Sequence, residues 1–315
     1  MESHENKPSR SLSDEERRGT LAGLACYAFW GLCPLYWKLL DHVNPFEVIA
    51  HRIIWCWVLV VALCLFFKMT WTPMLASKRA WGHLAPAAVL ITINWSLYIY
   101  AVVSGHVVDT ALGYYINPLV TILLGTLFFK ERLTPLQTAA VGLCLAGVGY
   151  FLVDHGELPW ISLALAVSFG LYGAVKKHGC YPAIPALAME NTLTVPFAVI
   201  GALALTVFTG DHAFLGASSA EGLTTTALLV GAGAVTAIPL VLFATAANNV
   251  PLSLMGFIQY VSPTCALILG VFVFGEPFTF AHAVCFGCIW AGLALVGIDS
   301  LRRERARRSH VQPNP

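Results

Sequence analysis

Long apolar blocks alternate with short polar segments along most of this chain. Each block has about the 20 residues that a helix needs to cross the hydrocarbon core of a bilayer. Transmembrane β-strands would instead alternate in polarity over segments of about ten residues, and the sequence shows no such pattern. The pattern therefore predicts ten membrane-spanning helices, at residues 19–40, 47–67, 82–103, 108–129, 135–153, 159–175, 184–208, 223–246, 252–275 and 281–299.

One stretch of this pattern occurs twice. Residues 117–134 read NPLVTILLGTLFFKERLT and residues 262–279 read SPTCALILGVFVFGEPFT, so Pro118 matches Pro263 at a shift of 263 − 118 = 145 residues. The alignment continues without a gap through the helix that follows each stretch. An apolar helix, a tight loop containing Glu and a second apolar helix have thus been duplicated.

The duplication predicts two similar halves, residues 19–154 and 155–299, flanked by a polar N-terminal tail (1–18) and a basic C-terminal tail (300–315). Each half would contain five spans, and an odd number of spans turns the second half upside down relative to the first. The expected fold class is an all-α integral membrane protein with ten transmembrane helices in two inverted five-helix repeats. Such repeats are typical of transporters, whose substrate site lies between the repeats.

The basic residues favour one orientation of these spans. All Lys and Arg residues except Lys38 and Arg52 lie in the two tails and in the loops on one predicted side of the membrane. Because cytoplasmic loops are enriched in Lys and Arg, we expect both termini to be cytoplasmic. The composition agrees with a membrane protein, since 57% of the residues are hydrophobic and 11% are charged, against about 25% charged in soluble domains.

The sequence indicates no metal, cofactor or enzyme site. Nine cysteines are scattered through the chain, and the CxxC spacing of Cys285 and Cys288 has no second pair nearby. No HExxH, no Ser/His arrangement and no phosphate-binding loop is found, so an intramembrane enzyme is the less favoured class. The expected partners are a small-molecule substrate and the lipid bilayer, with no nucleic acid. We expect a monomer, and a homodimer is the alternative.

Lys38 and Arg52 are the two basic residues that depart from the topology rule. Lys38 ends the first span, where it could reach toward the outer headgroups or help to receive an anionic solute. Arg52 lies about five residues, or roughly 8 Å, inside the second span. An arginine at the centre of a membrane helix costs about 2.5–3.5 kcal/mol on insertion scales, so Arg52 predicts a partner or a water-filled cavity.

A second polar pair occupies the matching place in the other half. At a shift of 190 − 51 = 139 residues, His51 and Arg52 correspond to Glu190 and Asn191. Burial disfavours the charged form of a carboxyl group, so Glu190 could carry a proton during transport. It could equally bond a neighbouring helix, and the sequence favours this structural or gating role slightly.

Other polar and aromatic residues fall at the same predicted depth. Tyr114, Asn117 and Thr121 form one stripe at helical spacing, and the repeat places Gln259 and Ser262 at the positions of the first two. Small polar residues also join helices to one another, so each alone is weak support for a site. The candidate substrate-binding residues are Trp30, Lys38, His51, Arg52, Asn94, Trp95, Tyr98, Tyr114, Asn117, Gln259 and Ser262.

Several of these segments resemble the RarD-type permeases of the EamA family, within the drug/metabolite transporter superfamily. The resemblance covers residues 19–299 and is carried by AFWGLCPLYWKLL (28–40), FEVIAHRIIW (46–55), INWSLYIYAV (93–102), ALGYYINPLVTILLG (111–125) and SLMGFIQYVSPT (253–264). It implies ten helices in two inverted repeats in the bacterial cytoplasmic membrane. The family's name is attached to chloramphenicol sensitivity.

The favoured function is a secondary transporter that moves a small organic solute by alternating access, with a drug or a metabolite such as chloramphenicol as the cargo. Arg52 would receive an anionic group, and the aromatic residues would stack on the solute. The alternative is a proton-coupled exporter of amino-acid-like metabolites that uses Glu190 as the proton carrier. The sequence identifies neither the solute, the direction of transport nor the coupling ion.

Overall fold

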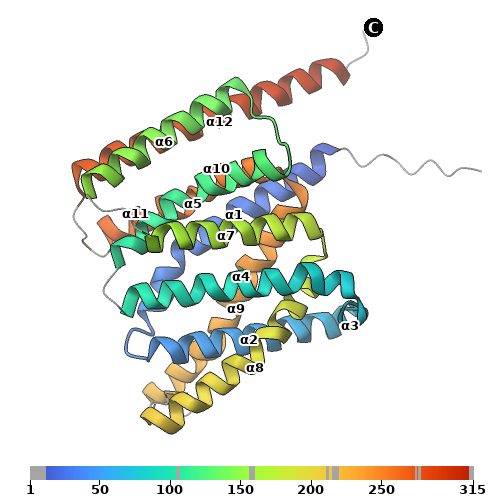
Figure 1. Cartoon of the computed structure of the whole chain (residues 1–315), viewed down its shortest axis with the longest axis vertical. Coiled ribbons are helices and arrows are strands. Elements are labelled where there is room, and N and C mark those ends of the chain that lie inside the picture. Colours follow the sequence, from blue (N-terminus) through green and yellow to red (C-terminus); the bar gives the residue numbers. More distant parts are fainter. Residues whose placement is uncertain are drawn as a thin grey trace, which may run out of the picture.

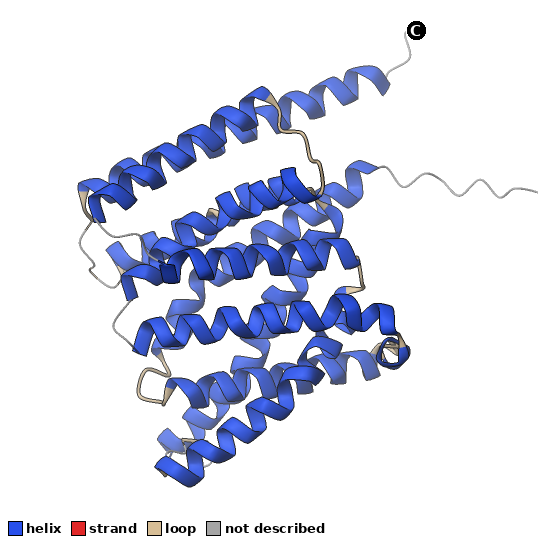
Figure 2. Cartoon of the chain, in the orientation of Figure 1, coloured by secondary structure: helices blue, strands red, loops and turns tan. Residues whose placement is uncertain are grey.

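The chain is described by a computed structural model over residues 12–103, 107–155, 160–210, 213–214, 220–273, 275 and 278–311. Over these ranges the fold is all-helical, with no strand (Figure 2). Residues 1–11 of the predicted N-terminal tail and residues 312–315 of the C-terminal tail lie outside this description, as does Glu276 of the repeat. The helices are α1 (Leu12–Lys38), α2 (Pro45–Phe66), α3 (Thr72–Ala76), α4 (Lys78–Val103), α5 (Val107–Phe128), α6 (Pro135–His155), α7 (Trp160–Gly179), α8 (Ala183–Thr209), α9 (Ala220–Asn249), α10 (Leu252–Gln259), α11 (Val261–Phe272) and α12 (Phe280–Val311).

Six helical segments among the described residues are long and apolar enough to cross a membrane. They are Pro45–Phe66, Pro135–Asp154, Ala183–Phe208, Glu221–Asn249, Leu252–Phe272 and Phe280–Arg302. The chain is therefore a multi-pass membrane protein. The remaining predicted spans also coincide with helices, but that these cross the bilayer stays a prediction.

The predicted span at residues 252–275 coincides with the spanning segment Leu252–Phe272, which the structure divides at Tyr260 into α10 and α11. Pro263, in the first turn of α11, explains the break. Proline has no backbone N–H, so the carbonyl of Gln259 loses its helical partner, and the proline ring would clash with that carbonyl. The Tyr260 hydroxyl group donates a hydrogen bond to the carbonyl of Tyr115 on α5 (3.4 Å), which fixes the junction against a neighbouring helix.

The helices lie roughly parallel or antiparallel in the bundle, with α1 and α9 crossing behind α4, α5 and α7 (Figure 1). α2 packs against both α8 and α9, and α5 packs against α7 and α10. α6 and α12 pack chiefly against each other and form one edge of the molecule (Figure 1). Helices far apart in the sequence therefore share each interface, and no half of the chain stands apart from the other.

Small residues set the close approach of α6 and α12. A Cβ added at Gly147 would lie 2.7 Å from the Cβ of Cys288 and 3.0 Å from the carbonyl oxygen of Cys285. A Cβ added at Gly292 would lie 3.1 Å from the carbonyl oxygen of Ala140. Backbones that approach this closely gain van der Waals contact, which is a main source of helix association within a bilayer.

Candidate functional site

Arg52 lies on the face of α2 that α9 covers. The two backbones approach closely at Gly233, where an added Cβ would overlap the backbone of Trp55 and Cys56. One turn further along α9, the Thr236 hydroxyl group accepts a hydrogen bond from Arg52 Nε (3.2 Å). Thr236 in turn donates to the carbonyl of Ala232 (2.8 Å), so its lone pairs face the guanidinium group. A glycine contact and a buried hydroxyl thus fix the position of Arg52.

Two tryptophans cover the guanidinium group. The Arg52 Cζ atom lies 4.5 Å from the ring centroid of Trp95 on α4 and 5.0 Å from that of Trp37 on α1. Cation–π contacts of this kind contribute about 0.5–2 kcal/mol each, the larger values applying when the charge is shielded from water. Tyr98 and Tyr114 lie within electrostatic range of Arg52, although 40% and 49% of their surfaces are exposed. We call Arg52, Trp37, Trp95, Tyr98 and Tyr114 the arginine site.

The positive charge of the arginine site has no acidic partner in the part of the chain that the structure describes. Among the described residues, no carboxylate oxygen lies within 4.0 Å of Arg52. Thr236 accepts only from Nε, whereas a guanidinium group carries five N–H donors in a planar fork. Such a fork matches carboxylate and phosphate groups in two-point contacts. The site is therefore suited to an anionic group of a ligand.

The other predicted binding residues are divided among separate contacts. Asn94 donates to the Leu165 carbonyl (2.9 Å) and to Ser168 Oγ (3.0 Å), so its amide joins α4 to α7. The Thr121 hydroxyl group donates to Gln259 Oε1 at 3.1 Å and lies 3.5 Å from Asn117 Oδ1, which links α5 to α10. Asn94 and Gln259 thus make the helix–helix contacts that polar side chains commonly make inside membranes, whereas Asn117 contacts Thr121 within α5.

Four more predicted residues lie outside the contacts described for Arg52. Trp30 packs edge-on against Tyr27 and Phe169 in an aromatic cluster. His51 accepts a hydrogen bond from Trp55 Nε1 (3.2 Å), and its ring lies 4.4 Å from that of Phe214. The backbone of Ser262 lies against Gly31 of α1, and Lys38 is the exposed last residue of α1. Consecutive helix positions point about 100° apart, which separates His51 from Arg52.

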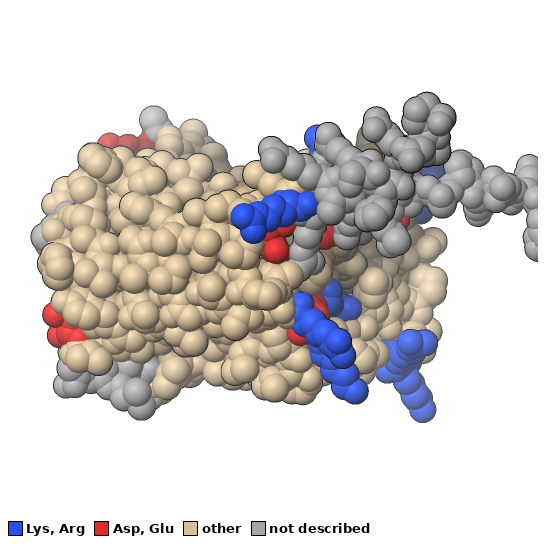
Figure 3. Space-filling view, turned by 90° about the horizontal axis from the view of Figure 1, so that it is seen from above, with Lys and Arg blue, Asp and Glu red and all other residues tan. Residues whose placement is uncertain are grey.

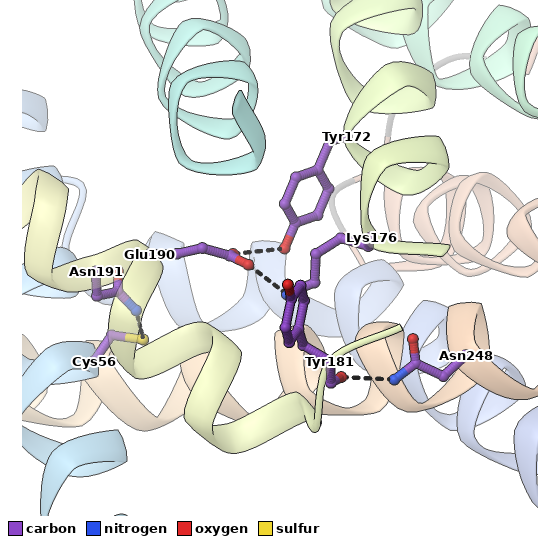
Figure 4. Close-up of polar contacts among 7 residues, drawn as sticks. All are labelled: Cys56, Tyr172, Lys176, Tyr181, Glu190, Asn191 and Asn248. Atoms are coloured by element: carbon purple, nitrogen blue, oxygen red, sulfur yellow. Dashed lines mark hydrogen bonds and ion pairs between the residues drawn. The ribbon is translucent and has the colours of Figure 1, made fainter. Parts of the chain in front are cut away.

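Glu190 forms a buried ion pair, which Figure 4 shows in close-up. Lys176 Nζ on α7 lies 2.6 Å from Glu190 Oε1 on α8, and both side chains are almost fully buried. The Tyr172 hydroxyl group, one turn before Lys176, lies 3.5 Å from Glu190 Oε2. Beside this pair, the Asn191 amide donates to Cys56 Sγ on α2 (3.4 Å). Cys56 lies one helical turn from Arg52, so the polar pair of the second half contacts the helix that carries the arginine site.

An apolar groove of about 630 Å³ runs between α2, α4 and α8. Its walls include Ile53 of α2, Val89 and Ile93 of α4, and Phe197 of α8. Phe197 and Val89 are largely exposed on the outside of the bundle. The groove is therefore part of the surface that faces hydrocarbon, and Trp95 of the arginine site packs against its lining residues Ala50 and Ile53.

Trp37, Lys176 and Thr236 take part in these contacts but were not among the predicted site residues. Trp37 lies in the stretch 28–40 that carries the family resemblance, but it is not one of the predicted binding residues. Lys176 was counted only as a topology signal, because lysines at the end of a span are typical of cytoplasmic loops. Thr236 gives no signal in the sequence, because one hydroxyl in an apolar helix is common.

The fold and the site together define a multi-pass helical membrane protein with an arginine inside a membrane helix that has no carboxylate partner among the described residues. Comparisons with known proteins identify its class. The model of the EamA-like transporter family matches the chain twice, over residues 17–153 and 158–298. The chain therefore belongs to the EamA-like transporter family, and its relatives identify it as a RarD-type permease within that family.

Those relatives cover nearly the whole chain. An uncharacterized transporter, YojE of Bacillus subtilis, is 41% identical over 301 residues, which cover 94% of this chain and 99% of that protein. Protein RarD of Streptomyces exfoliatus is 39% identical, covering 95% and 94%. Protein RarD of Escherichia coli is 36% identical, covering 92% and 97%. A solved crystal structure at 19% identity has the same fold, with a TM-score of 0.70 over 89% of this chain and 97% of that one.

Proposed function

We propose that this transporter is a secondary permease that carries a small organic solute with an anionic group, and that the solute binds at the arginine site. The observation that carries the proposal is the guanidinium group of Arg52, which lies against Trp37 and Trp95 and has no carboxylate partner among the described residues. A charge at that depth in a membrane helix is costly without a partner. A carboxylate or similar group on the solute supplies that partner, and the site is then neutral while the solute crosses.

We further propose that transport proceeds by alternating access between two inverted five-helix halves. Contacts between repeat-related residues support this arrangement. Tyr260 bonds Tyr115, and the two residues differ by the repeat shift of 260 − 115 = 145. The contact of Gly147 with Cys285 has its counterpart in the contact of Gly292 with Ala140, since the same shift relates both pairs. Such reciprocal contacts are expected around a two-fold axis that relates the halves.

The orientation with both termini in the cytoplasm is also a proposal. Figure 3 shows Lys and Arg side chains gathered toward one end of the molecule, with a broad uncharged surface beyond them. Lys68 follows α2, Lys78 begins α4, Lys130 follows α5 and Lys177 lies in the last turn of α7, so these charges belong to the same end of the bundle. The positive-inside rule makes that end cytoplasmic in the bacterial inner membrane.

Glu190 is better suited to a structural role than to proton transfer. Its carboxylate is paired with Lys176 at 2.6 Å and lies next to Tyr172. Removing one partner of such a buried pair leaves an uncompensated charge, which costs about 3–5 kcal/mol. We therefore propose that Glu190 joins α8 to α7 and that Asn191 joins α8 to α2. We also propose that the permease acts as a monomer.

The test is counterflow of radiolabelled solutes into proteoliposomes that contain the purified protein. The panel includes organic anions, neutral analogues of the same shape, and chloramphenicol, because one relative is named "Chloramphenicol-sensitive protein RarD". We expect an anionic solute to be transported and Arg52→Ala to abolish its transport. Arg52→Lys should restore little of this transport, because lysine lacks the planar fork of N–H donors. Normal transport of the anion by Arg52→Ala would falsify the proposed site.

A further inference from the structure

The carboxylate of Glu131 caps the start of α10 across the interface between the two halves. Glu131 lies in the loop between α5 and α6, in the first half. Its Oε1 accepts a hydrogen bond from the backbone N–H of Leu252 and its Oε2 accepts one from Ser253, both at 2.8 Å. The first N–H groups of a helix have no partner within the helix, and they attract negative charge. Hydrogen bonds to a charged group are about twice as strong as neutral ones.

Lys177 joins the same contact from α7. Its Nζ donates to the carbonyl of Val250 (2.6 Å), lies 3.8 Å from Glu131 Oε1 and lies 5.5 Å from the ring centroid of Phe129. Lys177 thus neutralises the carboxylate and also holds the residue that links α9 to α10. We call Glu131, Lys177 and the backbone of residues 250–253 the α10 clasp.

α5 and α1 also pack closely against the junction between α9 and α10. A Cβ added at Gly125 of α5 would lie 2.7 Å from the backbone nitrogen of Ser253, and one added at Gly19 of α1 would lie 2.6 Å from the Cβ of Asn249. Val250 and Leu252 are fully buried. The end of the bundle that contains Glu131 is therefore closed around the start of α10. Near the arginine site, by contrast, Tyr98 and Tyr114 are 40% and 49% exposed.

We propose that the α10 clasp is the gate latch that keeps the Glu131 end of the permease closed while the arginine site is open to the opposite face. The inference rests on the proposed function. A solute bound at Arg52 can leave toward the Glu131 end only if the junction of α9 and α10 moves away from α5 and α7, and that movement breaks the bonds of Glu131. The Glu190–Lys176 pair lies wholly within the second half and survives the movement.

The test uses the native thiol of Cys56 as a reporter, with the other eight cysteines replaced by alanine. Cys56 is buried and lies one turn from Arg52 toward the Glu131 end. Its reaction with a membrane-impermeant maleimide is timed in inverted vesicles and in right-side-out vesicles. We expect Glu131→Gln and Lys177→Met each to raise the labelling rate from the Glu131 end about tenfold, which corresponds to about 1.4 kcal/mol. Lys130→Met is the matched control, because it removes the exposed lysine beside Glu131 and should change nothing.

Two results would overturn the latch. One is an unchanged labelling rate from the Glu131 end in both variants. The other is an equal rise from both faces, which would indicate general loosening rather than opening at one end. Size-exclusion chromatography establishes whether each variant is folded. If Glu131→Gln does not fold, the labelling rate of Lys177→Met alone tests the latch. Labelling needs no transported solute, so failure of the counterflow assay would count against the proposed function alone.

Discussion

At the scale of single residues, the basic and acidic groups inside this bundle differ in how they are neutralised. Lys176 and Lys177 are adjacent, yet one pairs with Glu190 on α8 and the other lies beside Glu131 in the loop after α5. Arg52 instead makes cation–π contacts with two tryptophans and donates a hydrogen bond to the hydroxyl group of Thr236. A basic group inside a membrane protein needs a partner for its charge. Of the three basic residues, Arg52 has no carboxylate partner among the described residues, so Arg52 is the one suited to bind a ligand.

Thr236 is a positioning residue for this site, and Thr236→Val tests it. Valine has nearly the same shape but cannot accept from Arg52 Nε. Loss of one hydrogen bond of about 1 kcal/mol should raise the half-saturation concentration for the transported anion about fivefold, with little change in maximal rate. Initial rates of uptake into proteoliposomes give both quantities. Thr236→Ser keeps the hydroxyl group and should restore the affinity, and an unchanged half-saturation concentration in Thr236→Val would show that the bond plays no part.

At the scale of helices, glycine contacts decide which pairs approach most closely. α6 and α12 pair through Gly147 and Gly292, and α2 and α9 approach through Gly233. Gly142 and Gly287 belong to the same two helices as the first pair, yet a Cβ at either would meet nothing within 4 Å. Two glycines of the same helix, such as Gly142 and Gly147 of α6, therefore differ in whether they contact a neighbouring helix, while each behaves like its repeat-related glycine in α12.

Gly147→Ala and Gly142→Ala make a matched pair of substitutions in α6. The alanine at 147 would press on Cys285 and Cys288 and should lower the melting temperature of the purified protein, since overpacking costs about 1–3 kcal/mol. The alanine at 142 has open space and a better helix propensity, so the melting temperature should stay the same or rise slightly. Thermal unfolding in detergent, followed by light scattering or an intrinsic fluorescence signal, measures both. Equal melting temperatures for the two variants would contradict the packing described for α6 and α12.

At the scale of the whole molecule, the bundle has a basic end, an uncharged middle and an opposite end without basic groups on the face seen in Figure 3. α1 begins and α12 ends at the same end of the bundle (Figure 1). The α10 clasp lies at the basic end, and Lys38 lies at the other. The proposed gate and the proposed site are thus separated along the direction in which a solute would move.

Single-thiol variants test this orientation directly. Cys180 follows α7 and is exposed, and Asp41 is exposed in the turn between α1 and α2. In intact bacterial cells, an impermeant maleimide should label Asp41→Cys within minutes and leave Cys180 unlabelled until the membrane is opened. Mass spectrometry of the purified protein reads the labelling. If both thiols react from the same face, the two positions share a side and the proposed ten-span topology is wrong.

Much of this protein could be read from its sequence, because a bilayer leaves the backbone few alternatives. Apolar blocks of spanning length must be helices, so the positions of the long helices follow from composition alone. The cost of a charge in hydrocarbon singled out Arg52 and Glu190 as residues that need partners. The 145-residue shift that aligns Pro118 with Pro263 predicted two related halves, and the contact between Tyr115 and Tyr260, which are related by that shift, was found only in the structure.

Only the tertiary structure determined which partner each buried polar or charged group has. Lys176, Thr236 and Trp37 come from three helices, and no local pattern distinguishes them from ordinary topology signals, helix contacts and interfacial anchors. Their roles arise where glycines let backbones approach and where helix rotation turns one of two neighbouring side chains inward. The sequence alone determined that charges must be satisfied within the membrane. The packing of distant helices determined that Glu190 is paired with a lysine, while Arg52 lies against Trp37 and Trp95 with no carboxylate partner among the described residues.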